Sequence, residues 1–191
     1  MDALVQDIKG RGRGRSLKFA LYAACASIVM IFIAFTSAYI VRKAQGNWLE
    51  FTMPNVFIIS TVVLLCSSAS LQASYRFFLR SKEVLYKVFM GLTFVLGITF
   101  LVLQVQGWTE LTQMGVTLNG NPAGSFVFVI SGVHALHLLG GIGTLIMALL
   151  HAFVLPFKPT EKRKLRFELT LIYWHFMDFL WVYLIIFLMI A

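Results

Sequence analysis

The sequence predicts an all-α membrane protein, built as a bundle of five transmembrane helices. Two observations carry this prediction, an apolar composition and the lengths of the uncharged runs. Hydrophobic residues make up 59% of the 191 residues, charged residues only 13%, and the mean hydropathy is +0.84. Since a soluble domain carries about 25% charged residues, these values place the chain in the membrane class.

Five uncharged runs each reach the roughly 20 residues that a helix needs to cross a bilayer. The predicted spans cover about residues 19–41, 51–75, 88–109, 125–153 and 169–191. The fourth uncharged run is too long for one span, so we expect its helix to end near residues 153–155, before Pro156. Residues 17–191 then form a single five-helix membrane domain, which follows a flexible basic arm at residues 1–16.

The distribution of Lys and Arg predicts how the bundle is oriented. Fourteen of the sixteen basic residues lie in the N-terminal segment and in the second and fourth connections, whereas the first connection holds only Arg42 and Lys43. The positive-inside rule then places the N-terminus in the cytoplasm and the C-terminus outside. The net charge of +8 is therefore a topology signal, with anionic lipid headgroups as its expected contacts. Nucleic-acid binding is disfavoured.

Most other features of the chain indicate turns and close packing rather than chemistry. Asn-Gly-Asn-Pro at residues 119–122 predicts turns in the third connection. Gly132 and Gly140 lie eight residues apart in the fourth span, where small residues allow helices to approach closely. Cys25 and Cys66 fit neither a metal-binding spacing nor a disulfide framework. The first apolar run is also too long for the hydrophobic region of a cleavable signal peptide.

An ionisable residue interrupts the last span. Asp178 follows His175 at a spacing of three residues, so the two side chains share a helix face within reach of each other. A charged group at the bilayer centre costs about 2.5–3.5 kcal/mol even on insertion scales, so such groups usually face protein or water. The other four spans contain no Asp, Glu, Lys or Arg, which argues against a self-contained proton channel or pump. A polar pair that faces another protein or a lipid fits better.

The remaining histidines could be structural or could bind a metal. His134 and His137 lie three residues apart in the fourth span, and with His175 they could hold haem, copper or iron. No Glu-x-x-His pairing or other part of a ligand set accompanies them. We therefore favour polar or lipid-facing roles. For Glu168, just before the fifth span, a solvated helix start and a headgroup site shared with residues 162–164 are equally supported.

Two C-terminal motifs resemble subunit III of haem–copper terminal oxidases. They are Gly-Ser-Phe-Val-Phe-Val-Ile-Ser-Gly-Val-His-Ala-Leu-His at 124–137 and Phe-Glu-Leu-Thr-Leu-Ile-Tyr-Trp-His-Phe-Met-Asp-Phe-Leu-Trp at 167–181. Residues 53–55 and Leu103-Gln104 agree with the same family. The resemblance extends over about residues 20–191 and is closest to the five-helix bacterial form, which lacks the first two helices of longer members.

The resemblance implies a subunit that binds no haem or copper itself. Those cofactors belong to partner subunits of a proton-pumping oxidase that reduces O2 to water. The chain would pack against catalytic subunit I, associate with subunit II, hold phospholipid and support the stability and proton uptake of subunit I, in the bacterial cytoplasmic membrane. Cytochrome c is favoured over quinol as the electron donor. Positions carried over from the family, with packing, lipid-contact or hydrogen-bonding roles and none catalytic, are His134, His137, Glu168, Trp174, His175, Asp178 and Trp181.

Two positions depart from the family pattern. A family carboxylate early in the first span is replaced by Ile28, and a family Glu position near the end of the third span falls at Gly107. A proton-collecting role of those carboxylates cannot apply to this chain. The competing hypotheses are subunit III of a quinol oxidase, an accessory subunit of a nitric oxide reductase system, and a stand-alone haem or metal protein that uses His134, His137 and His175. A small transporter is disfavoured, because intramembrane charge is scarce and broken helices are lacking.

Overall fold

The computed structural model describes the backbone of residues 2–154 and 160–190, and the side chains of residues 14–154 and 160–190. Within these residues the chain is all-helical, as predicted. The five helices are α1 (Asp2–Ala44), α2 (Val56–Leu79), α3 (Glu83–Gln113), α4 (Pro122–Phe153) and α5 (Glu161–Ile190). Each is long and apolar enough to cross a membrane, which confirms the predicted number of five membrane helices.

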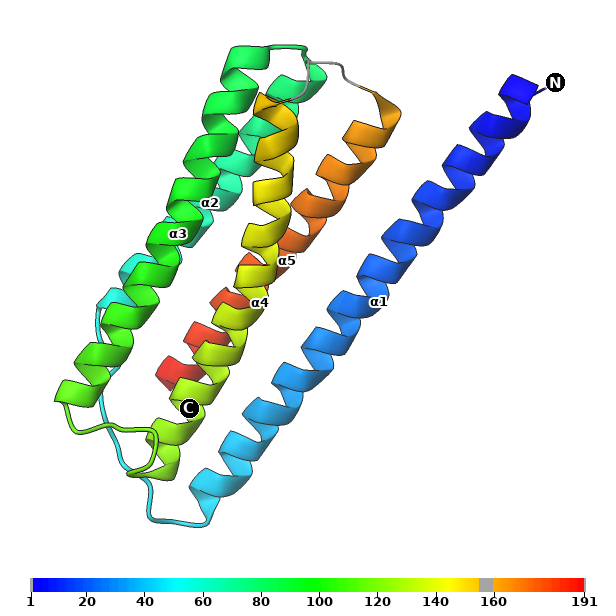
Figure 1. Ribbon diagram of the computed structural model, residues 1–191. Coiled ribbons are helices and arrows are strands. Elements are labelled where there is room, and N and C mark those ends of the chain that lie inside the picture. The colour runs from blue at the N-terminus through cyan, green and yellow to red at the C-terminus, as the bar shows by residue number, and fades with distance from the viewer. Residues whose placement is uncertain (1, 155–159, 191) are drawn as a thin grey trace.

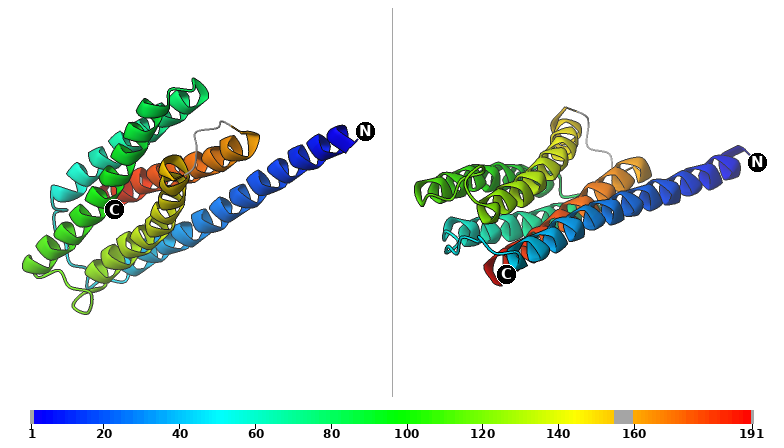
Figure 2. Two further views of the ribbon diagram at one scale, coloured as in Figure 1. Left: turned by 45° about the horizontal axis from the view of Figure 1, so that its top comes forward. Right: turned by 90° about the horizontal axis from the view of Figure 1, so that it is seen from below.

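Helices α2, α3, α4 and α5 form a ring in which each packs on the next and α5 closes on α2 (Figure 1). Helix α1 packs on α4 and α5, outside this ring. Helix α5 therefore contacts both α1 and α2, which do not contact each other among the described residues. In the right-hand view of Figure 2, α1 runs along α5, and α3 and α4 lie toward the top. The two ends of the chain lie at opposite ends of the bundle (Figure 1), as an odd number of spans requires.

The N-terminal segment differs from the prediction. Residues 1–16 were expected to form a flexible arm, but helix α1 begins at Asp2 and continues without a break into the first span. Gly10, Gly12 and Gly14 lower the helix propensity of this segment, and the long apolar helix that follows extends through it nonetheless. The basic residues of the segment therefore lie on a continuous helix.

Helix α4 ends at Phe153, within the range expected from the sequence. It begins earlier than expected because Asn121 caps it. The Asn121 side chain accepts a hydrogen bond from the Ala123 N–H at 3.0 Å, and Pro122 occupies the first turn, where no N–H is needed. Leu155, Pro156 and Lys158, which entered the predictions for the fourth connection, lie outside the described residues.

Candidate functional site

His175 joins α5 to α2 at the middle of both helices. Its Nε2 donates to Gln72 Oε1 at 3.2 Å, and its Nδ1 is hydrogen-bonded to Ser68 Oγ. Because a neutral imidazole has one donor and one acceptor nitrogen, Nδ1 accepts from Ser68 in this arrangement. The histidine thus forms an interhelical network, half-buried on the outer side of the bundle.

Asp178 lies directly behind this network. Its Oδ2 is 3.9 Å from His175 Nδ1, which confirms the predicted proximity, but the distance is too long for a hydrogen bond. Asp178 is only 3% exposed, and neither carboxylate oxygen has a hydrogen-bond partner among the residues that the structure describes. A buried carboxylate without a partner is unfavourable in the bundle. The pairing of His175 with Asp178 that the sequence predicted is therefore a close approach at ion-pair distance, without a hydrogen bond.

Glu168 of α5 is hydrogen-bonded to α1 and α2 at the basic end of the bundle. Lys18 Nζ of α1 donates to Glu168 Oε2 at 2.6 Å, and the Tyr75 hydroxyl of α2 donates to Oε1 at 2.8 Å. Glu168 is therefore neither merely a solvated helix start nor a partner of residues 162–164 alone. Its carboxylate fixes the spacing of α1, α5 and α2. The sequence carries no local signal for this junction, because Lys18 lies 150 residues away.

The two tryptophans of the C-terminal motif extend from α5 into the buried centre of the bundle. Trp174 donates its indole N–H to Ser67 Oγ at 3.0 Å, and Trp181 donates to Thr61 Oγ1 at 2.9 Å. Both rings are fully buried. These contacts fix the rotation of α5 against α2.

His134 and His137 occupy different environments on α4. His134 is fully buried between Phe32, Phe100 and Trp181, and neither of its ring nitrogens has a hydrogen-bond partner among the described residues. The Nδ1 of His137 donates to the Val133 carbonyl of its own helix at 2.8 Å.

A metal centre built from His134, His137 and His175 is not supported by this geometry. His175 is engaged with α2, whereas His134 is enclosed by aromatic rings of α1, α3 and α5. Across the residues that the structure describes, no three His, Cys, Asp or Glu side chains gather as ligands would. The structure therefore gives these histidines no common ligand site.

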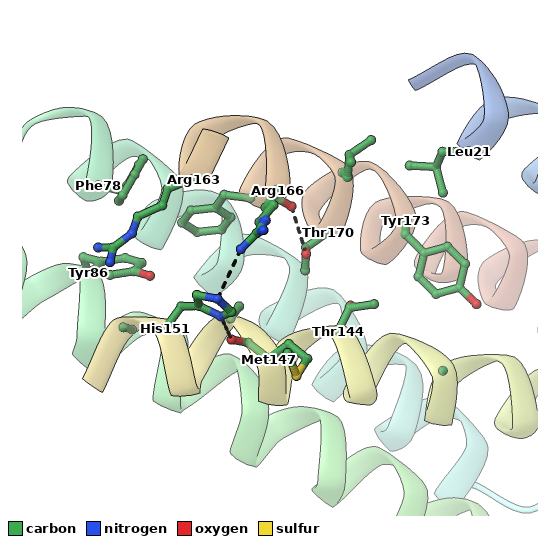
Figure 3. Close-up of a pocket in the computed structure, with 15 residues that line it drawn as sticks. Leu21, Phe78, Tyr86, Thr144, Met147, His151, Arg163, Arg166, Thr170 and Tyr173 are labelled. Atoms are coloured by element: carbon green, nitrogen blue, oxygen red, sulfur yellow. Dashed lines mark hydrogen bonds between the residues drawn. The ribbon is translucent and has the colours of Figure 1, made fainter. Parts of the chain in front are cut away.

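A cavity of about 760 Å³ opens between α4 and α5 near the basic end of the bundle (Figure 3). Its polar rim includes Arg163, Arg166 and His151. His151 Nδ1 donates to the Met147 carbonyl, which leaves Nε2 to accept a hydrogen bond from Arg166 Nη1 at 3.2 Å. The deeper walls are apolar apart from hydroxyl groups, and Leu21 of α1 lies at one side. Sequence reasoning did not identify this cavity or the role of His151.

At the two positions where the family has a carboxylate, this chain has residues that pack closely against neighbouring side chains. Ile28 packs against the hydrophobic core from α1. Gly107 lies against the Phe57 ring, and a Cβ atom on Gly107 would be 2.8 Å from that ring. The bundle thus has no space for a side chain at Gly107.

Comparisons with known proteins agree with the resemblance noted in the sequence. The sequence profile described as "Cytochrome c oxidase subunit III" matches residues 13–191. The chain is 29% identical to cytochrome c oxidase subunit 3 of Corynebacterium diphtheriae, over 83% of this chain and 80% of that protein. It is 30% identical to cytochrome bo(3) ubiquinol oxidase subunit 3 of Buchnera aphidicola, over 88% and 87%.

Mammalian relatives are matched over a smaller part of their length. The identity to mouse cytochrome c oxidase subunit 3 is 31%, over 66% of this chain and 47% of the mouse protein. The matched part of this relative is therefore about half of it, whereas the bacterial relatives are matched over most of their length.

Proposed function

The chain belongs to the cytochrome c oxidase subunit III family of haem–copper oxidases, and from this premise we propose that it is a non-redox support subunit of a proton-pumping terminal oxidase. It binds to catalytic subunit I and is part of a complex that also contains subunit II. Haem and copper in those partner subunits reduce O2 to water. This chain maintains the stability and the proton uptake of subunit I.

The observation that carries this proposal is the arrangement of polar groups inside the bundle. Interhelical hydrogen bonds of Trp174, Trp181 and His175 hold α5 on α2, and these groups serve to position helices. Of the histidines that could have bound a metal, His134 is enclosed by aromatic rings, His175 is bonded to α2 and His137 is bonded to its own helix. Such a bundle provides a surface to which a partner subunit binds, and the reduction of O2 takes place in the partner.

The cavity between α4 and α5 suits a phospholipid. Arg166 and Arg163 provide positive charge at its rim, where an anionic phosphate would lie, and His151 orients Arg166. The apolar walls beside Thr144 and Met147 suit the start of an acyl chain. We propose that a lipid bound here seals the space between the helices and stabilises the junction of this subunit with its partner.

The orientation follows from the charge distribution. We propose a multi-pass protein of the bacterial cytoplasmic membrane, with the N-terminus and the rim of the cavity on the cytoplasmic side. Cytochrome c is the favoured electron donor of the complex. Quinol is the second candidate donor, and the 30% identity to the bo(3) ubiquinol oxidase subunit of Buchnera aphidicola supports it.

The test is purification of the tagged chain from its native membrane in a mild detergent, followed by identification of its partners and an optical spectrum. We expect the haem-bearing oxidase subunits in the purified complex, with haem absorbance that disappears when those subunits are removed. Oxygen uptake with reduced cytochrome c or with quinol identifies the donor. Stoichiometric haem or copper on the isolated chain would overturn the proposal.

A further inference from the structure

The outer side of the bundle carries a polar surface where α2 meets α5. We call it the seam face and define it by Ser68, Gln72, Ile172, His175 and Phe179. We propose that the seam face is the docking surface for one transmembrane helix of the haem-bearing oxidase subunit, a helix with a hydrogen-bonding side chain at the depth of His175. This inference rests on the proposed function and specifies where the partner binds.

Leaving the polar groups of the seam face in lipid is unfavourable. Ser68 lies at the middle of α2 and His175 at the middle of α5, so their polar groups lie near the centre of the apolar layer. Gln72 uses its Oε1 to accept from His175, which leaves two amide protons for an outside acceptor. Acyl chains offer no hydrogen bonds there. A protein helix with a polar side chain does.

The seam face differs from the other outward-facing polar groups of the bundle. The hydroxyls of Ser27, Thr99 and Thr109 each donate to the carbonyl four residues earlier in their own helix. Such groups are satisfied in lipid without any partner. Even His137, the half-exposed histidine of α4, bonds its own helix. At the seam face the bonds run between helices instead.

Asp178 lies behind the seam face. Its carboxylate is buried behind His175 and has no hydrogen-bond partner among the described side chains. In the present arrangement His175 carries its proton on Nε2, and Nδ1 accepts from Ser68. An outside donor to Nε2 would favour the other tautomer, whose Nδ1–H would face Asp178 Oδ2, 3.9 Å from Nδ1. The described residues leave the network incomplete, and a donor from a partner helix would complete it.

The shape of the bundle suits a helix as the occupant. Helix α5 packs on both α1 and α2 (Figure 2). Phe179 follows His175 by four residues on the same face of α5 and is 77% exposed. A partner helix laid along α5 would cover Phe179 and the seam together. A second copy of this chain would bring a second unpartnered carboxylate to the same place, so we favour the catalytic subunit.

Photo-crosslinking in the intact complex tests the proposal. p-Benzoylphenylalanine replaces Phe179 on the seam face or, as a control, Leu136, which is 65% exposed near the middle of α4, a helix that contributes no residue to the seam face. We expect cross-links from position 179, and none from position 136, to the haem-bearing subunit, identified by mass spectrometry.

A second measurement uses substitutions. Because a hydrogen bond between helices in a membrane is worth about 0.6–1.7 kcal/mol, Gln72→Leu should weaken retention of the haem-bearing subunit by about 3- to 20-fold on detergent dilution. Thr99→Val, which removes a self-satisfied hydroxyl, should not change it.

The outcomes separate this inference from the proposed function. If the complex co-purifies but only position 136 cross-links to the catalytic subunit, or neither position does, the seam face is not the docking surface and the proposed function stands. A cross-link from position 179 to a second copy of this chain also overturns the inference. If no haem-bearing subunit co-purifies with the unmodified chain, the proposed function itself fails.

Discussion

The ring of Trp174 occupies the space beside Gly97, at 2.9 Å from the position that a Cβ atom on Gly97 would take. This close approach lets the indole reach across from α5 to α3 while its N–H bonds Ser67 on α2. The pair therefore joins three helices at the centre of the bundle, and glycine is required because its backbone touches the ring.

Gly97→Ala should destabilise the bundle by about 1–3 kcal/mol, the usual cost of forcing an extra methyl group into a packed core. The measurement is the free energy of unfolding in detergent, followed by tryptophan fluorescence. Gly91→Ala on the same helix is the control, because a Cβ there has no atom within 4 Å. Equal stability of the two variants would show that Trp174 has room to move.

The junction at Glu168 should respond to either of its partners. We expect Glu168→Gln and Lys18→Met each to loosen α1 from α5, and the double variant to lose less than the sum of the two, because both break the same 2.6 Å ion pair. Since Lys18 is 38% exposed, screening limits the coupling energy to about 0.2–1 kcal/mol. A double-mutant cycle on thermal stability, repeated at high salt, measures it. Additive losses at low salt would contradict the pairing.

The fold was predictable where the membrane itself imposes a rule. Every spanning helix must satisfy its backbone internally and be long enough to cross the apolar layer, so uncharged runs identified all five helices. The start of α4 depended on the Asn121 cap rather than on hydropathy. The helical state of residues 2–16 was missed because three glycines in that segment oppose helix formation.

The candidate site was predictable only within a single helix. The spacing of His175 and Asp178 gave their proximity, since a helix repeats every 3.6 residues. Their partners on α2 were not predictable, because Ser68 and Gln72 meet α5 only after the rotation of each helix has been set by packing. The same holds for Lys18 and Tyr75 at Glu168. Contacts of this kind follow from tertiary structure and leave no local pattern in the sequence.

Asp178→Asn should separate stability of the isolated subunit from stability of the complex. Because a buried charge without a hydrogen-bond partner is unfavourable, replacing the carboxylate with a neutral amide should leave the unfolding temperature of the isolated chain the same or raise it. In the complex, the loss of the carboxylate behind His175 should weaken the contact with the partner, and activity should fall after fewer turnovers. Oxygen-uptake time courses measure this. A complex that survives turnover like the wild type would show that the carboxylate is dispensable.

Arg166→Gln should remove bound phospholipid. The side chain lies at the rim of the cavity between α4 and α5, where His151 holds it, and its charge is the natural contact for a phosphate. We expect native mass spectrometry of the purified complex to show about one lipid fewer per subunit. Arg80→Gln, at the exposed end of α2, is the control for a general loss of basic charge. Equal lipid content in the two variants would argue against a headgroup site at Arg166.

A carboxylate cannot be restored at Gly107 without a compensating change. A Cβ atom there would lie 2.8 Å from the ring of Phe57, which is almost fully buried, so Gly107→Glu should prevent correct packing of α3 on α2. Gly107→Ala should lower the free energy of unfolding by about 1–3 kcal/mol.

Phe57→Leu should recover part of that loss when it is combined with Gly107→Ala, because the smaller side chain leaves room for the new methyl group. Gly143→Ala, where a Cβ meets no atom within 4 Å, is the control and should leave stability unchanged. Thermal unfolding in detergent of Gly107→Ala, Phe57→Leu, the double variant and the control measures the coupling. The double variant could instead lose as much stability as the sum of the losses of the two single variants. In that case the Phe57 ring would not be what excludes a side chain at Gly107, and strain in the α3 backbone would have to be the cause.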